Sequence, residues 1–169
     1  MESGDNGDYS AMSGADSDLF WAMQQADEEA ALEALSNGAS RDLLTTQLLE
    51  AAKEGHIARL RLALRLGGSV EALDARGTNF AALHWAAIKG QCAAIPILVD
   101  AGAYVDQPGL SGSTPLQLAV IHGNPDVVQA LLQAGASKHV LNDQKMSALN
   151  LAAALPQGKL SLSVLQAHA

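Results

Sequence analysis

The amino-acid sequence predicts an all-α solenoid of about four helix–turn–helix repeats with an N-terminal helical cap. The first observation is a series of small-residue turns that close successive segments, centred on Gly38, Gly68, Gly102, Gly135 and His168. The second is a leucine that opens a helix in register, at Leu19, Leu48, Leu83, Leu116 and Leu149. The third is an alanine three residues later, at Ala22, Ala51, Ala86, Ala119 and Ala152. A period near 33 residues with this helical content is typical of stacked repeats.

The stretch 112–136 is the best-preserved unit and shows how a repeat is built. Pro115 fits the first turn of a helix, where its missing N–H is not needed. Asn124-Pro125 caps and begins a second helix, and Gly135 stands where a helix C-terminus favours glycine. Two such short antiparallel helices cannot bury their own apolar faces, so neighbouring units have to stack on them.

The N-terminal segment has a different composition. Residues 1–16 are mainly Gly, Ser and Asp and are predicted to form a disordered acidic arm. Ser17-Asp18 is expected to cap the first helix of a terminal unit, and Asp27 to begin the second. The link from residue 38 to 48 is too short for a projecting loop, so residues 41–50 are expected to begin directly as a helix.

The repeat motifs resemble those of the ankyrin family, whose pattern includes Thr-Pro-Leu-His-x-Ala, a glycine-containing helix turn and a Leu-Leu-x-x-Gly-Ala ending. Thr114–Ala119 matches with Gln for His, Ala81–Ala86 keeps the His, and Ser147–Ala152 keeps the Leu and the Ala. The resemblance implies an ankyrin-repeat solenoid with β-turn fingers at right angles to the helices. Its domain is expected to span 17–169, with the cap at 17–40 and repeats at 41–74, 75–107, 108–140 and 141–169.

Turn sequences between the units predict three fingers. Asp74–Gly77 and Gly109–Gly112 contain glycine, which supplies the backbone conformations of tight turns. Asn142–Lys145 lacks glycine but contains Asn and Asp, which tolerate the same geometry.

Composition and charge restrict the class of protein. One cysteine in 169 residues excludes an internal disulfide framework, and no apolar run approaches the roughly 20 residues of a membrane span. An acidic N-terminus without an apolar signal segment adds to a prediction of a cytoplasmic protein with no direct membrane insertion.

The net charge of −8 is unevenly distributed. Residues 1–40 hold nine acids and no Lys or Arg, whereas residues 41–169 hold nine acids and ten bases. The only basic group is Arg59, Arg61 and Arg65, which is expected on a solvated face or against an acidic partner. Nucleic acid is not an expected partner, because its binding requires clustered Lys and Arg.

No residue pattern predicts catalysis, a metal site or a cofactor. The five histidines are not spaced as zinc ligands. The ankyrin resemblance implies that His56 and His84 tie turns and neighbouring repeats by hydrogen bonds. Cys92 is expected to face the core. Glycine pairs do not precede a helix that could hold a phosphate. We therefore expect a non-enzymatic chain.

The expected binding face is the concave groove, which fingers and the exposed sides of first helices line in stacked repeats. Its mixed apolar and basic character fits another protein's extended peptide or loop, with apolar anchors and some negative charge. Trp85 has two interpretations, packing between first helices or contacting the partner, whereas Tyr104 is expected to pack. The finger candidates are Arg76, Leu110, Ser111, Ser113, Asp143, Gln144 and Met146, and the first-helix candidates are Trp85, Ile88, Lys89, Ile121 and His122. We expect a monomer.

Residues 83–88, 102–107 and 112–116 resemble more narrowly the N-terminal ankyrin domain of DHHC-type palmitoyltransferases. That resemblance implies a domain that recruits substrates for protein S-acylation at the cytosolic face of an endomembrane. This chain has no Asp-His-His-Cys motif and would be only the recruiting part. A third possibility is a structural or regulatory spacer in which the acidic arm is the working part.

The last helix is more apolar than the end of a stacked array usually is. An exposed apolar end favours either a longer protein or an interface at this end. The residues that make it apolar are Leu160, Leu162, Val164 and Leu165.

Overall fold

The computed structural model describes residues 12–75 and 77–167. These residues form ten α-helices and one short 3-10 helix, η2 (Leu110–Gly112), without a β-strand. The predicted all-α fold class is confirmed. The α-helices are α1 (Gly14–Gln25), α2 (Glu28–Ser36), α3 (Arg41–Glu54), α4 (Ile57–Arg65), α5 (Ala82–Lys89), α6 (Ala94–Asp100), α7 (Pro115–Ile121), α8 (Pro125–Gln133), α9 (Ala148–Ala154) and α10 (Gly158–Ala167).

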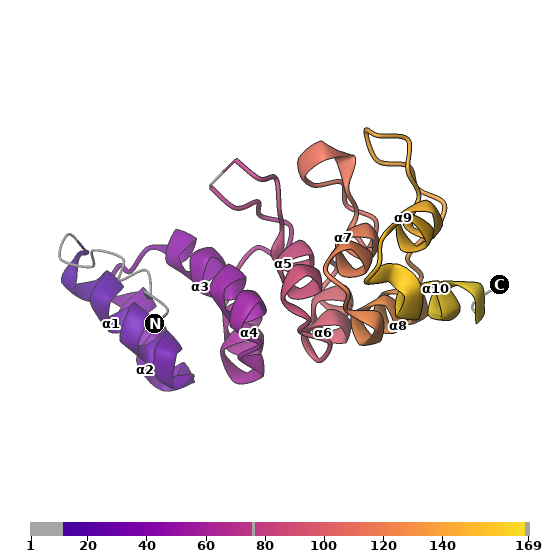
Figure 1. The fold of residues 1–169 in the computed structure, drawn as a ribbon. Helices are drawn as coiled ribbons and strands as arrows, with labels where there is room; N and C mark the ends of the chain where they lie inside the picture. Colours follow the sequence, from indigo (N-terminus) through magenta and orange to yellow (C-terminus); the bar gives the residue numbers. More distant parts are fainter. Residues whose placement is uncertain (1–11, 76, 168–169) are drawn as a thin grey trace, which may run out of the picture.

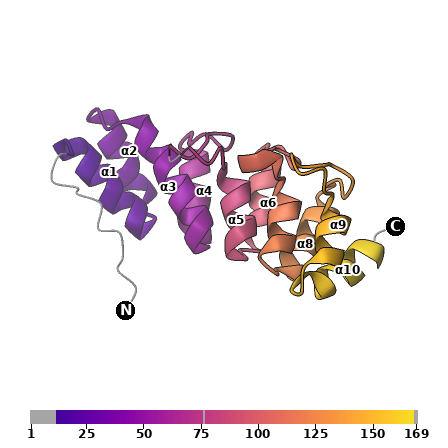
Figure 2. The ribbon, with the colours of Figure 1, turned by 45° about the horizontal axis from the view of Figure 1, so that its top comes forward.

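The helices are arranged as five pairs stacked from one end of the molecule to the other (Figure 1). The first helices α3, α5, α7 and α9 form one row, and the view in Figure 2 shows the same order of pairs along the chain. Three loops project beyond this row, as the sequence predicts. Main-chain hydrogen bonds close finger 1 (residues 74–80) at 2.8 Å, finger 2 (109–113) at 2.9 Å and finger 3 (142–146) at 3.1 Å.

Helix α1 begins earlier than the sequence predicts. The Ser13 hydroxyl caps it by accepting a hydrogen bond from the Asp16 N–H at 3.1 Å, so Ser17-Asp18 is not the cap. Residues 14–16 therefore belong to a helix and not to a disordered arm. Residues 1–11 of that arm lie outside the described residues. The other two predictions here are confirmed, because Asp27 caps α2 and α3 begins at Arg41.

The recurring leucine and alanine form the core. Leu19, Leu48, Leu83 and Leu116 are at most 1% exposed, and the recurring alanine is buried in all five pairs. Alanine at this position lets the first helices approach one another closely, while the leucines fill the space between the helices. In the last pair the leucine, Leu149, is partly exposed.

A set of side-chain hydrogen bonds, which we call the turn ladder, joins the helix turns of neighbouring repeats. Its members are the amides of Gln91, Asn124 and Gln157, which are 33 residues apart. Gln91 Nε2 donates to Lys53 O at 3.0 Å, Asn124 Nδ2 to Ala87 O at 2.8 Å and Gln157 Nε2 to Ile121 O at 2.9 Å. Each accepting carbonyl lies in the last turn of a first helix, where it has no partner within the helix.

Glycine is required beside the turn ladder. Gly55 (φ +76°) and Gly90 (φ +75°) end α3 and α5 in the left-handed conformation that favours glycine. A Cβ at Gly55 would collide with the Gln91 amide, and one at Gly90 would lie 3.2 Å from Asn124 Oδ1. The glycine thus ends one helix and leaves room for the next repeat's side chain.

A second set, which we call the finger ladder, lies at the start of the first helices and joins α5 and α7 to the backbone of the fingers. Its members are His84, Gln117 and Asn150, and each accepts a hydrogen bond from the N–H of its own helix N-cap, at 3.1, 3.0 and 3.0 Å. His84 Nε2 also bonds Gln107 O at 2.8 Å, and Gln117 Nε2 donates to Val140 O and Met146 O at 2.8 and 3.0 Å. The role predicted for His84 is confirmed.

Carboxylates form a third link between successive units. Asp16 Oδ1 accepts from Ser40 N at 2.7 Å, Glu71 Oε1 from Tyr104 N at 2.7 Å and Asp106 Oδ1 from Ser137 N at 3.0 Å. The bond from Ser40 lowers the pKa of Asp16, because it favours the charged form. Burial raises the pKa of Asp106 despite the bond from Ser137.

The last repeat closes differently. Its helix turn lacks a left-handed glycine, since Leu155 is extended (φ −99°, ψ 137°) and Pro156 follows. Gly158 begins α10 directly against α9, where a Cβ would lie 2.6 Å from Ala152 Cα. Only part of the predicted apolar end is exposed, because Leu165 is buried whereas Leu160 is 68% exposed.

The finger ladder predicts a pH-dependent stability. Burial lowers the pKa of His84 from 6.5 to about 4, against hydrogen bonds with the Gln107 and Ser113 backbones that act the other way. Below pH 6.5 the unfolded chain binds a proton that the folded chain excludes, so stability falls as the pH drops from 6.5 toward 4. We expect this group to remove about 2 kcal/mol between pH 7.5 and 4.5, measured by urea unfolding.

Other groups also titrate in this range, so the control is His84→Gln, which installs the residue of the next repeat. The variant should keep the hydrogen bonds with Ala81 N and Gln107 O, because a glutamine side chain can accept the first and donate the second. It should lose the part of the pH dependence that comes from His84. Equal losses of stability in the wild type and in His84→Gln would contradict the prediction.

Candidate functional site

A pocket of about 250 Å³ lies in the groove, between fingers 2 and 3 and the helices α7 and α9. We call it the groove pocket. Its floor and walls are mainly apolar, and Ser111, Asn142 and Gln144 add polar groups. The remaining lining residues are Phe80, Leu110, Ser113, Leu118, Ile121 and Leu151.

The groove pocket brings together five of the twelve residues that the sequence singles out. These are Leu110, Ser111, Ser113, Ile121 and Gln144. Leu110 is 52% exposed at the tip of finger 2, whereas Ser113 is buried. Their role in binding stays a prediction.

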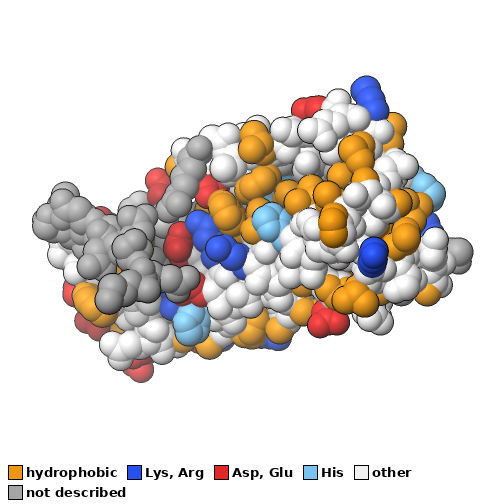
Figure 3. All heavy atoms as spheres, viewed as in Figure 1, with side chains coloured by type: hydrophobic (Ala, Val, Ile, Leu, Met, Phe, Trp, Pro, Cys, Tyr) orange, Lys and Arg blue, Asp and Glu red, His pale blue; other side chains and the backbone are white. Residues whose placement is uncertain are grey.

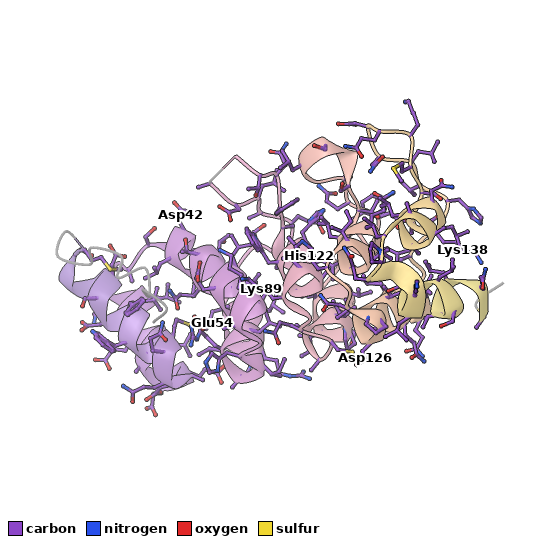
Figure 4. The ribbon with its side chains drawn as sticks, viewed as in Figure 1. Asp42, Glu54, Lys89, His122, Asp126 and Lys138 are labelled. Carbon is purple, nitrogen blue, oxygen red and sulfur yellow. The ribbon has the colours of Figure 1, made fainter. Side chains whose placement is uncertain are left out.

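The other candidates lie outside the lining of the groove pocket. Asp143 and Met146 belong to finger 3, and Asp143 N donates to Ser111 O at 3.1 Å, which joins two fingers. Lys89 and His122 are exposed at the C-terminal ends of the neighbouring helices α5 and α7 (Figure 4). Ile88 is partly buried. Arg76 lies outside the described residues.

Four lining residues were not identified from the sequence. Leu118 and Leu151 occupy the same repeat position as Trp85, so the 33-residue register could have found them. Phe80 stacks on His84 with ring centroids 5.2 Å apart. Asn142 shapes finger 3, because its Oδ1 accepts from Gln144 N and Met146 N at 3.0 Å each.

Trp85 combines both of the interpretations that the sequence allows, since it is packed yet partly exposed. Its ring meets Phe80 edge-on at 5.5 Å, and Lys53 Nζ lies 4.5 Å from the ring centroid. The Lys53 ammonium also pairs with Glu50 at 3.0 Å and Asp74 at 3.7 Å. Trp85 therefore stands beside a charged cluster on α3 and finger 1.

The groove is consequently polarised along its length. Its α3 end holds Glu50, Lys53 and Asp74 around a smaller pocket of about 180 Å³. Toward the C-terminal end, the helices α5, α7 and α9 contain no Asp or Glu. Figure 3 shows this change, with hydrophobic side chains gathered below the fingers over α5 and α7 and charged ones toward α3.

Finger 1 is held differently from the other fingers. Leu49 occupies the finger-ladder position of its repeat, equivalent to His84 and Gln117, and an alkyl side chain cannot bond a finger carbonyl. The contact of Lys53 with Asp74 spans from α3 to finger 1 in its place.

Several predictions for individual side chains are wrong. Cys92 is exposed because it lies in the turn before α6. Tyr104 is 60% exposed, since only its main chain is tied to Glu71. His56 is exposed, and within the described residues its ring lies 3.9 Å from Glu54 Oε2 and does not bond a neighbouring repeat. Arg59 is buried, with Nη1 3.1 Å from Glu54 Oε2.

Within the described residues, no three or more His, Cys, Asp or Glu side chains are grouped as a metal site. No helix in this part of the chain has the length and apolar character needed to cross a bilayer.

Comparison with known proteins identifies the repeat. A family model described as "Ankyrin repeat" matches residues 111–143, which include α7 and α8. Residues 111–143 are an ankyrin repeat, and the chain has the fold of an ankyrin-repeat solenoid. This confirms the resemblance that the repeat motifs indicate, and ankyrin repeats as a class are protein-interaction modules that are typically non-catalytic.

The ankyrin-repeat chain is similar to parts of larger proteins. It is 36% identical over 104 residues to mouse "Inactive serine/threonine-protein kinase TEX14", covering 62% of this chain and 7% of that protein. Human "Palmitoyltransferase ZDHHC13" is 31% identical over 112 residues, covering 66% of this chain and 18% of the relative. Human "Protein phosphatase 1 regulatory subunit 27" is 36% identical over 66 residues, covering 39% and 43%. The chain thus spans less than half the length of each of these relatives.

The charged cluster predicts a local change in Lys53→Met. Methionine keeps much of the aliphatic stem, but Glu50 and the buried Asp74 lose the ammonium. We expect faster amide exchange in finger 1 and a loss of about 2 kcal/mol, below the ~3–5 kcal/mol typical of breaking a fully buried pair. Hydrogen-exchange mass spectrometry and urea unfolding measure the two effects.

The matched control is Lys89→Met, which removes an exposed ammonium from the next repeat. It should change stability by no more than about 0.5 kcal/mol. Unchanged exchange in finger 1 of Lys53→Met would show that this cluster does not hold the finger.

Proposed function

We propose that this ankyrin-repeat chain binds an extended segment of a partner protein in its concave groove and has no catalytic activity of its own. The observation that carries the proposal is the groove pocket, which is apolar and framed by two fingers. Partly exposed Leu110 and Ile121 offer it apolar surface that the fold does not need for its own core.

The size of the groove pocket favours a side chain over a small molecule. Its volume of about 250 Å³ is below the ~300–1,000 Å³ typical of small-molecule sites. One or two apolar side chains of a partner fit this space better. Ser111 and Gln144 at the fingers can bond the polar main chain that accompanies them.

Charge around the groove pocket favours a segment with acidic residues next to its apolar anchor. The exposed Lys89 ammonium and the exposed His122 imidazole lie at the C-terminal ends of α5 and α7. The first helices here contribute no carboxylate. Opposite charges at the rim of an interface mainly raise specificity and association rate.

A matched pair of exposed leucines tests the groove. Peptides of 12 residues are selected from a displayed random library on the wild-type chain, and their dissociation constants are measured by fluorescence polarisation. Leu110→Asp should weaken binding about tenfold or more, because it places a charge at the mouth of an apolar pocket.

Leu160→Asp makes the same chemical change on α10, outside the groove, where Leu160 is 68% exposed. It should bind the selected peptides as the wild type does. The groove proposal fails if Leu110→Asp binds as tightly as the wild type, or if both variants lose affinity equally.

A second candidate function is the substrate-recruiting part of a membrane-bound DHHC-type palmitoyltransferase. The 31% identity to human ZDHHC13 supports it. The chain would then act at the cytosolic face of an endomembrane, whereas the first candidate would act in the cytoplasm. Sequencing the transcript beyond the codon for Ala169 tests it. An open frame encoding membrane spans and Asp-His-His-Cys is expected, and a stop codon at that point would exclude this candidate.

A further inference from the structure

A second pocket, of about 330 Å³, lies at the N-terminal end of the solenoid between α1 and α2. We call it the Trp21 pocket. Its α1 wall is Asp18, Trp21, Ala22 and Gln25, spaced three or four residues apart on one helix face. Its α2 wall is Ala30, Glu33, Ala34 and Asn37, with Asp27 at the turn. Trp21 is 60% exposed, unusual for so large an apolar side chain.

The Trp21 pocket is acidic, and none of the described residues that line it is Lys or Arg. Its walls hold Asp18, Asp27 and Glu33, and neither α1 nor α2 contains Lys or Arg. Among the described residues, Glu28 of α2 pairs with Arg65 of α4, and neither residue lines the Trp21 pocket. The rest of the lining consists of three alanines and the amides of Gln25 and Asn37.

Another site in the molecule has an indole and carboxylates together with a cation that contacts both. At the α3 end of the groove, the Lys53 ammonium lies 4.5 Å from the Trp85 ring centroid and pairs with two carboxylates, Glu50 and Asp74. A cation is attracted both to the face of an indole and to carboxylates beside it. The Trp21 pocket has an indole and carboxylates too, but not the cation.

We propose that the Trp21 pocket binds a lysine or arginine side chain from a basic segment of a partner protein. The cation would lie against Trp21 between Asp18 and Glu33, and its aliphatic stem would pack on the alanines. This surface belongs to the cap and is separate from the groove. The segment that it binds is basic, whereas the segment proposed for the groove is apolar and acidic. The whole-chain charge of −8 adds long-range attraction for such a segment.

Intrinsic fluorescence gives a readout at the pocket itself. The chain has two tryptophans, so Trp85→Phe leaves Trp21 as the only one. The probe is an eight-residue peptide of alternating glycine and lysine, with the arginine and glutamate versions beside it. The lysine and arginine peptides should shift Trp21 emission saturably, whereas the glutamate peptide should not.

Charge removal separates the pocket from general attraction. Asp18→Asn with Glu33→Gln should weaken lysine-peptide binding about tenfold in the wild-type background, measured by calorimetry at 50 mM salt. Asp100→Asn with Asp126→Asn removes two exposed acidic charges from α6 and α8 and should change it less than threefold. Asp126 is labelled in Figure 4.

A third variant isolates the indole. Trp21→Leu should weaken binding about two- to fivefold, as expected for an exposed cation–π contact. Equal losses in the two double-charge variants, or no response of Trp21 emission, would overturn the proposal and leave only non-specific attraction. Binding to the groove is unaffected by either result, because Leu110→Asp and these variants change different surfaces.

Discussion

The structure depends on one recurring interaction, an amide side chain that donates to a carbonyl left open at the end of the preceding first helix. Gln91, Asn124 and Gln157 make it at 2.8–3.0 Å. Buried or partly buried carbonyls without partners are costly, so each repeat is satisfied only when the next one is in place. Hydrophobic contact drives the stacking of helices, but it is not directional. The turn ladder supplies the direction and fixes the register of one repeat on another.

The finger ladder carries this register from the helices to the groove. His84 and Gln117 bond the backbone at fingers 2 and 3. These bonds fix the position of the two fingers that frame the groove pocket. The lining residues can then stay apolar, because their neighbours satisfy the main chain. Finger 1 has Leu49 in place of the ladder residue, and the contact of Lys53 with Asp74 joins it to α3. Structural support and the lining of the groove pocket are thus divided between adjacent positions of the same helix.

The fold could be predicted from the sequence because its signal repeats. Leucine and alanine recur at fixed positions, and glycine turns recur between them. The turn ladder is harder to predict from the sequence, because its residue type varies between Gln and Asn although the 33-residue spacing is constant. Contacts between non-equivalent positions carry no periodic signal. The burial of Arg59 beside Glu54 and the cluster of Lys53, Asp74 and Trp85 are of this kind, and only three-dimensional coordinates bring them together.

The N-terminal cap is joined to the repeats without a rung of the turn ladder. His56 follows the α3 C-cap Gly55, at the position where the later repeats carry the ladder amides, and it is exposed. The C-cap of α1 is Ala26 and not a glycine. The joint consists instead of contacts such as Arg65 with Glu28 and Gln24 with Gln47. In a linear array each unit is stabilised only by its neighbours, so cooperativity is weakest at the weakest joint. Unfolding of this chain should therefore start with release of the cap as a separate unit, while the remaining repeats stay folded.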